Sequence, residues 1–332
     1  MDASGQLVTD FTGIVNPTVK DSKVTVTCLK NSNKDDSPAF TFTDYPNTIF
    51  IGNDSVRNGK FSFTFTVPKD ISYSNLQGKM NLYAVDTESG NEAQGNFDNF
   101  IVGGTSDTAE TDTIGPEIRA LYLNDTTFMD GGQVNTTPYF VAELWDKSGV
   151  NITGSSVGHD MMLVIDESTV LSYNLNSYYE LLPGEDGTGI VKFPIPALEP
   201  GKHTAEFWVW DILNNSTVRT FTFEVVEGLK PFLFDVIATP GIAREQVTFH
   251  LMHNRPESRM RVGIMVYDLA GRQLWKHEES GTSGLFENYT VSWDLTSGGA
   301  RMRPGVYIYR AAISTDNSKD ATKARKFIIL GE

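Results

Sequence analysis

The single cysteine is the first residue of this chain whose chemistry needs testing. A thiolate paired with histidine is a recurring catalytic nucleophile. Cys28 lies in the alternating stretch 24–29, and no Gly-rich turn or helix start beside it would favour the thiolate. We therefore expect Cys28 to be a small buried or half-buried strand residue. A peptidase that uses Cys28 is an alternative, and it would require a base within reach.

Other catalytic signatures are absent from the sequence. The five histidines show no HExxH or HxxxH spacing, and one cysteine leaves no room for a cysteine-rich zinc site or an internal disulfide. There is no GxSxG nucleophile motif, and the Gly-rich pairs lack the Lys-Ser/Thr of a phosphate-binding loop. The sequence thus gives no catalytic residue and no cofactor motif.

Acidic residues near the middle of the chain could bind a metal ion. Calcium takes six to eight oxygen ligands, and loops at one end of a sandwich can gather them. The candidate ligands are Asp146, Asp160 and Asp211. The alternative is that such Asp and Asn residues form Asx turns, and the pattern favours it.

Two tryptophans form the candidate for sugar binding. Trp208 and Trp210 lie two residues apart in an alternating stretch, so they share one face of a strand. An exposed pair would be a stacking platform of a carbohydrate-binding or adhesion module. Core or inter-domain packing is the commoner role of such a pair.

Charge excludes some partners and suggests another. The 42 acidic and 27 basic residues give a net charge of −15, which argues against nucleic acid as a partner. No apolar run is long enough to span a membrane as a helix. Residues 228–332, however, hold 14 basic and 11 acidic residues, so this part alone is net positive. A solvated sheet face explains this, but so does a surface that docks an acidic partner, with the candidates Arg301, Arg303, Arg310, Lys323, Arg325 and Lys326.

These residues must be positioned by strands, because period-two alternation is the dominant pattern. Apolar residues alternate with polar ones, between turn residues, and no stretch has a convincing helical period. We expect an all-β protein with strands in the ranges 24–29, 60–68, 80–85, 205–210, 220–226, 262–267 and 306–312.

Composition divides the chain into three parts of about a hundred residues, the usual size of a β-sandwich. A small, polar and acidic stretch at 105–114 reads as a linker, and a second break lies near residue 228. We expect three tandem immunoglobulin-like β-sandwich domains at 1–104, 115–227 and 228–332. The first two share a faint repeat of strand, Gly turn, strand, Asx-rich turn and strand.

The last two parts also carry family-like motifs. In the second, these include Asp146-Lys147-Ser148-Gly149-Val150-Asn151-Ile152-Thr153-Gly154, Gly158-His159-Asp160 and Gly201-Lys202-His203. In the third, they include Val266-Tyr267-Asp268-Leu269-Ala270-Gly271-Arg272, Val291-Ser292-Trp293-Asp294 and Pro304-Gly305-Val306-Tyr307. The former resemble the region downstream of the peptidase domain in the PorU family, gingipain-like cysteine peptidases that act as sortases of the Bacteroidetes type IX secretion system. The latter resemble a C-terminal sorting domain of that system, although Thr239-Pro240-Gly241 replaces its usual opening.

The resemblance implies a role for the chain. In the PorU family the catalytic residues lie in a peptidase domain, which in this protein would precede residue 1. This chain would therefore be the non-catalytic C-terminal region. The full enzyme would remove sorting domains from exported cargo at the cell surface. The last domain would dock on an outer-membrane β-barrel protein of the secretion system, and no resident cofactor is implied.

Overall fold

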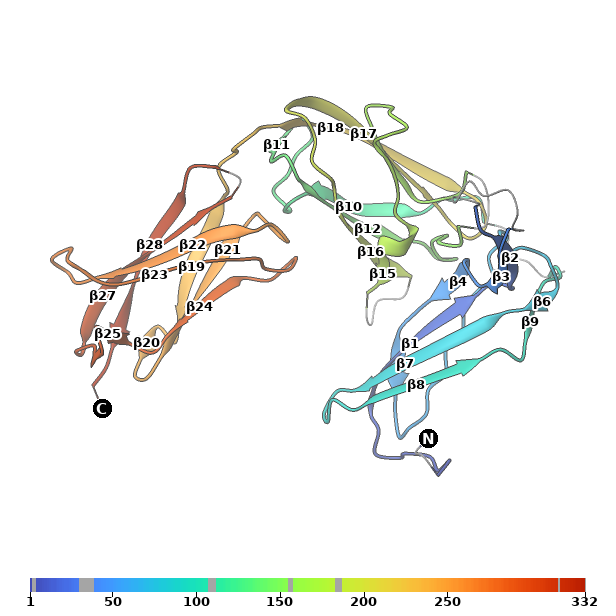
Figure 1. The fold of residues 1–332 in the computed structure, drawn as a ribbon, viewed down its shortest axis with the longest axis horizontal. Coiled ribbons are helices and arrows are strands. Elements are labelled where there is room, and N and C mark those ends of the chain that lie inside the picture. The colour runs from blue at the N-terminus through green and yellow to red at the C-terminus, as the bar shows by residue number, and fades with distance from the viewer. Residues whose placement is uncertain are drawn as a thin grey trace. The chain divides into compact units, whose positions relative to one another are not determined.

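The computed structural model describes residues 1, 4–29, 39–106, 112–154, 158–182, 187–315 and 317–331. Figure 1 shows their regular structure as strands joined by loops, which confirms the all-β class. The one helical element among these residues is the three-residue 3-10 helix η1 (Asn176–Tyr178), which is too short to cross a membrane. Each sheet takes its strands from one of three stretches of sequence, 13–102, 117–225 or 233–329.

The first stretch forms one five-stranded sheet and two small ribbons. The sheet has the order β4-β1-β7-β8, with β5 also paired to β1, and the ribbons are β2-β3 and β6-β9. The strands are β1 (Gly13–Lys20), β2 (Val24–Thr27), β3 (Thr41–Asp44), β4 (Thr48–Ile51), β5 (Asp54–Val56), β6 (Leu76–Gln77), β7 (Lys79–Asp86), β8 (Glu92–Phe97) and β9 (Ile101–Val102).

The second stretch forms two facing sheets, β10-β12-β16-β15 and β11-β18-β17-β13-β14. Alternation places Ala205, Phe207 and Val209 of β17 in the core and leaves the intervening residues half-buried. The strands are β10 (Glu117–Leu123), β11 (Gln133–Val134), β12 (Tyr139–Trp145), β13 (Met162–Ile165), β14 (Ser172–Asn174), β15 (Tyr179–Leu181), β16 (Thr188–Pro194), β17 (Gly201–Trp210) and β18 (Ser216–Val225).

The third stretch has sheets β19-β21-β24 and β20-β28-β27-β22-β23, with the ribbon β25-β26. Both sheets contribute to one core, and the Tyr309 hydroxyl donates to the carbonyl of Val236 across it at 3.0 Å. The strands are β19 (Leu233–Thr239), β20 (Ile242–Ala243), β21 (Val247–His253), β22 (Met260–Tyr267), β23 (Gln273–Gly281), β24 (Tyr289–Trp293), β25 (Thr296–Ser297), β26 (Ala300–Arg301), β27 (Gly305–Ser314) and β28 (Ala321–Ile329).

Immunoglobulin-like β-sandwich architecture is thus the fold class, as the alternation indicates. Contact density divides the chain into two compact units, one of Met1–Leu121, Val141–Phe193 and Thr204–Phe221, the other of Tyr122–Phe140, Pro194–His203 and Thr222–Glu332. The expected boundaries at 104/105, 114/115 and 227/228 stay predictions.

One expected strand is wrong. Residues 61–68 belong to no strand, although Phe63 and Phe65 do point inward and stack on Phe50, with ring centroids 5.8 and 4.8 Å away. Alternation reports one buried face, whereas a strand also needs a hydrogen-bonding neighbour. The other six expected strands are present as β2, β7, β17, β18, β22 and β27.

Candidate functional site: a buried aspartate between loops

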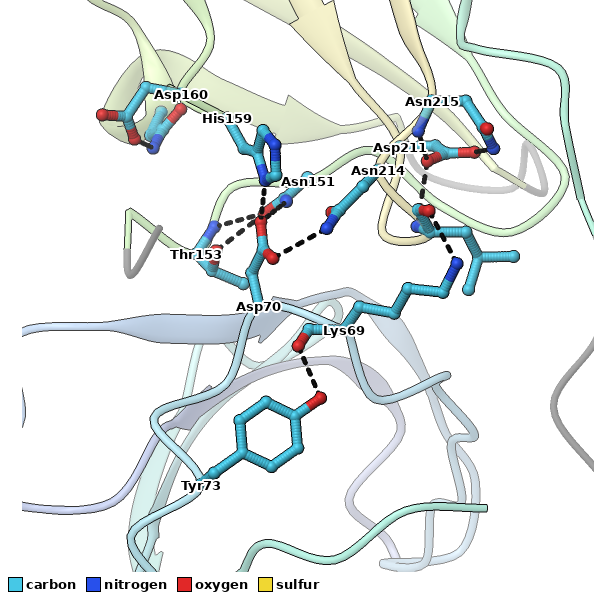
Figure 2. A network of polar contacts seen from close by, with 12 residues as sticks. Lys69, Asp70, Tyr73, Asn151, Thr153, His159, Asp160, Asp211, Asn214 and Asn215 are labelled. Atoms are coloured by element: carbon cyan, nitrogen blue, oxygen red, sulfur yellow. Dashed lines mark hydrogen bonds and ion pairs between the residues drawn. The ribbon is translucent and has the colours of Figure 1, made fainter. Parts of the chain in front are cut away.

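Asp70 is the centre of a polar network that sequence reasoning missed. It follows Pro68 in a segment without strands and is 6% exposed. Its carboxylate lies 2.7 Å from His159 Nδ1 and accepts hydrogen bonds from the side-chain amides of Asn151 at 3.1 Å and Asn214 at 2.9 Å (Figure 2). One side chain of the first stretch thereby joins three loop positions of the second.

The loops of the second stretch are shaped to present these groups. Asn151 accepts from the N–H and hydroxyl of Thr153 through its side-chain oxygen, which leaves the amide N–H free to point at Asp70. Asn214 has a positive φ of 70°, which Asn tolerates better than most residues. The His159 ring lies over Trp210, with 4.4 Å between ring centroids.

The residue before Asp70 reinforces the contact. The Lys69 ammonium donates to the carbonyl of Leu213, and the Lys69 backbone N–H donates to the carbonyl of Ile212, both at 2.9 Å. The Tyr73 hydroxyl in turn donates to the Lys69 carbonyl at 2.8 Å (Figure 2). These residues all belong to one compact unit, and the network fixes the strand-free segment around Asp70 to the loops around Asn151 and Asn214.

Two of the three expected calcium ligands come together, with a different third. Carboxylate oxygens of Asp112, Asp146 and Asp211 lie within 4.8 Å of one another, and Asp112 belongs to the stretch expected to be a linker. Asp160 lies elsewhere and accepts from the side-chain amide of Asn176 at 2.7 Å. Asp160 is therefore separate from the Asp112, Asp146 and Asp211 group, which we call the acidic triad.

Two residues of the acidic triad also accept hydrogen bonds from nearby backbone N–H groups, as in Asx turns. Asp146 accepts the backbone N–H groups of Ser148 and Gly149, and Asp211 accepts those of Leu213 and Asn215. Burial, opposed by these hydrogen bonds and reinforced by the charges of Asp211 and Asp112, raises the pKa of Asp146 to about 6. Three crowded carboxylates would suit a hard cation, and calcium binding stays a prediction.

The six basic docking candidates lie on different surfaces. Arg310 and Lys326 point outward from β27 and β28, whereas Lys323 and Arg325 reach β19. Arg325 pairs with Asp235 at 2.9 Å, and the Lys323 ammonium donates to the carbonyl of Phe234. Arg301 and Arg303 are exposed in the turn around β26. The Arg301 guanidinium donates to the carbonyl of Arg244.

An apolar surface accompanies the outward pair. Antiparallel register places Ile308 opposite Lys326, and Val306 opposite Ile328, on the same outer face. Exposed side chains that we call the apolar stripe are Ile242, Val306, Ile308, Ile328 and Leu330. Arg310 and Lys326 border the stripe at one end.

The remaining candidates are Cys28 and the tryptophan pair Trp208 and Trp210. Cys28 is exposed, and the expected burial is wrong because β2 ends at Thr27, one residue before the cysteine, and the partner strand β3 is exposed along its whole length. Trp208 and Trp210 are half-buried: the Trp208 indole donates to Glu206, and the Trp210 ring is against His159. They form no open stacking platform.

The fold and the site define an immunoglobulin-like β-sandwich protein whose first sheets are tied to the next by a buried aspartate. The chain is similar over its whole length to part of latent PorU from Porphyromonas gingivalis, with 38% identity, 31% of that chain covered and a TM-score of 0.40. It therefore spans about a third of the PorU chain. No family model matches the sequence, and no curated protein does.

More distant similarities are to tandem sandwich structures. The Ig1-2 module of the Drosophila receptor tyrosine phosphatase DLAR is 11% identical, with 65% of this chain and 98% of that chain covered and a TM-score of 0.25. A tetra-tandem repeat from the extending region of a large adhesion protein is 14% identical, with 97% and 68% covered and a TM-score of 0.22.

Proposed function

We propose that this chain is the non-catalytic accessory and docking region of a cell-surface cysteine peptidase that processes C-terminal sorting domains of type IX secretion cargo. The observation that carries the proposal is the 38% identity to PorU along the whole chain. The chain corresponds to 31% of the PorU chain, and the proposed peptidase activity belongs to a part of the parent protein that this chain does not include.

The surroundings of Cys28 support a non-catalytic role. Cysteine nucleophiles work with a nearby base. In the part of the chain that the structure describes, the rings of four histidines are hydrogen-bonded to groups other than Cys28, namely Asp70, the Glu199 carbonyl, Ser283 and Glu279. The fifth, His250, lies in β21, where its backbone pairs with β19 and β24.

The Asp70 network supports a spacer role for the first two parts. A spacer must resist bending where its modules meet, and polar side chains at such a joint fix one geometry when their hydrogen bonds are satisfied. Asp70 and Lys69 together make contacts to residues at 151, 159, 212, 213 and 214. We infer that this joint makes the first two parts a rigid spacer beside the peptidase.

The apolar stripe supports a docking role for the third part. Exposed apolar patches rimmed by polar groups are typical of interaction surfaces. The proposed partner is an outer-membrane β-barrel protein of the secretion system, contacted by the apolar stripe, with Arg310 and Lys326 pairing to acidic groups. The proposed location of the parent protein is the extracellular face of the outer membrane.

Retention at the outer membrane tests the proposal. Deletion of residues 228–332 from the parent protein should release it from the membrane fraction, and Ile308→Asp should weaken retention by placing a charge in the apolar stripe. Thr290→Asp is the matched control, since Thr290 is exposed on β24 of the opposite sheet. Unchanged retention after the deletion would refute the docking role.

A further inference from the structure

The outer face of the first sheet carries a regular grid of polar side chains. Antiparallel pairing places Asn16, Tyr83 and Gln94 in one row across β1, β7 and β8, and Thr18, Asn81 and Asn96 in the next. These six residues line a shallow depression on the sheet, together with Leu82 and Gly95. Val15 and Val19 of β1 alternate with the grid positions and are buried, so the grid faces away from the core. We call the six residues the amide platform.

The platform is unusual for strand positions. Asn is among the residues depleted in strands, whereas Thr is enriched in them. Four of the six positions are carboxamides, and none is charged, in a chain with 69 charged residues from the 42 acidic and 27 basic ones. Residues placed against local preference are a recognised sign of a functional surface.

The hydrogen-bonding capacity of the platform is unused. Each carboxamide offers two N–H donors and an oxygen acceptor. Among the residues that the structure describes, the side chains of Asn16, Asn81, Gln94 and Asn96 have no partner. Their groups therefore bond only to water in the free protein, and a ligand can replace that water without breaking a protein contact.

Tyr83 adds an apolar surface within the grid. It lies between Asn16 and Gln94 in its row, and burial together with the neighbouring Glu92 carboxylate raises the pKa of its hydroxyl. An aromatic ring offers a face for C–H groups, while flanking amides bond to hydroxyls. Charged residues lie only in the adjoining rows, with Glu92 at one end and Lys20 and Lys79 at the other.

We propose that the amide platform binds a neutral oligosaccharide. A sugar offers hydroxyl groups that both donate and accept, and a carboxamide can bond two neighbouring hydroxyls through its oxygen and its N–H group. Opposite side chains in a row are about 5 Å apart and successive rows about 7 Å apart, so the grid can contact more than one sugar unit. The strand β8 is at the sheet edge, which leaves one end of each row open.

A panel of neutral oligosaccharides tests this site. Calorimetry with hexasaccharides of glucose, mannose, galactose and xylose, and with a charged polyuronate for comparison, should reveal binding of at least one neutral member and weaker binding of the polyuronate. The double variant Gln94→Ala/Asn96→Ala and the single variant Tyr83→Ala should each weaken that binding at least about tenfold, since each removes direct contacts.

The control isolates the site from general effects. Thr41→Ala/Thr43→Ala changes two exposed strand residues of β3 and should leave binding unchanged. Melting of each variant verifies that the sandwich remains folded. If no neutral hexasaccharide binds, or if the platform variants bind as the unmodified chain does, the inference is wrong. Membrane retention through residues 228–332 is a separate readout, so either proposal can fail alone.

Discussion

At the residue scale, the buried carboxylate of Asp70 is the most consequential group. It can only accept hydrogen bonds when ionised, and its neighbours include two amide N–H donors and a histidine nitrogen. Losing one partner of such a buried group leaves the others unsatisfied, at a cost of about 1–3 kcal/mol each.

Asp70→Asn tests this interpretation with little change in shape. The new amide would place N–H donors opposite existing donors, so we expect a loss of about 2 kcal/mol in unfolding free energy. Urea unfolding followed by tryptophan fluorescence measures it, with Trp210 beside His159 as a local reporter. Asp98→Asn, at an exposed position, is the control. Equal stability of the two variants would contradict a structural role for Asp70.

Asp146 makes stability depend on pH. Its pKa rises from 3.8 when unfolded to about 6 when folded, so the folded state binds the extra proton. The resulting stabilisation is full below about pH 3.8 and is lost as pH rises through about 6. We expect Asp146→Asn to gain about 1–3 kcal/mol relative to the unmodified chain between pH 4 and 7. Parallel pH curves for the two proteins would contradict this assignment.

Bound calcium would favour the charged form of Asp146, whereas burial favours the protonated form. A cation bound by the acidic triad would favour its charged form and stabilise the fold, by about 2.7 kcal/mol at a concentration 100-fold above Kd. We expect calcium to raise the melting temperature, a chelator to reverse the effect, and Asp146→Asn to lack it. Metal analysis without bound calcium, together with no change in melting, would remove the calcium prediction.

The sequence indicated part of the acidic triad. Asp146 and Asp211 stand in turn-rich loops of a recognisable type, so their meeting could be expected. The presence of Asp112 in the triad could not be predicted, because it lies in a stretch without an apolar period. Asp70 left no local signal, because its partners are 81, 89 and 144 residues away in sequence. Such contacts follow from packing and not from any short motif.

At the element scale, the buried Arg255 attaches the chain entering the third part to its core. Arg255 is 1% exposed, although it stands in a run of three arginines with Arg259 and Arg261, a pattern that predicts a solvated surface. Its guanidinium donates to the carbonyls of Leu229, Lys230 and Asn254 at 3.1, 3.4 and 3.1 Å. Burial of a charge in this way requires several acceptors, which the incoming segment provides.

Arg255→Lys tests the role of the planar guanidinium. An ammonium cannot reach several carbonyls in the same geometry, so we expect a loss of about 2–4 kcal/mol and faster amide exchange at 229–233. Hydrogen exchange measured by mass spectrometry locates the change. Arg259→Lys changes a more exposed arginine of the same run and should have little effect. Similar exchange in both variants would show that Arg255 does not hold the segment.

Strand prediction succeeded where alternation coincided with pairing. β7, β17, β22 and β27 all have neighbours on both sides in their sheets, so one pattern served both requirements. The 61–68 segment has the same alternation, and its Phe63 and Phe65 still bury against Phe50. Periodicity therefore located two inward side chains, whereas Phe61 and Val67 of the same predicted face are exposed, and it could not reveal which extended segments find a partner.

At the scale of the whole molecule, the sandwiches differ in how much core they possess. A single cluster of 22 buried hydrophobic residues lies within 233–329. Among the described residues of 13–102, the buried hydrophobic side chains are six: Val15, Val19, Ile49, Val56, Ile71 and Val102. Small cores make domains marginal, since burial is the main favourable contribution to folding.

Isolated fragments should therefore behave differently. We expect residues 228–332 to fold alone with a cooperative thermal transition, whereas 1–104 alone should be markedly less stable than within 1–227. Calorimetry of the three fragments measures this. A fragment 1–104 that melts as it does within 1–227 would show that the contacts of Lys69 and Asp70 contribute little.

The Asp70 joint also limits how this architecture can be recombined. Tandem sandwiches are commonly regarded as interchangeable beads, which evolution or an engineer can shuffle between proteins. Here, the polar side chains of Asn151, His159 and Asn214 are hydrogen-bonded to Asp70, a residue of the neighbouring sandwich. A transplanted second sandwich would carry three orphaned donors into its new host, so the smallest portable piece is the pair.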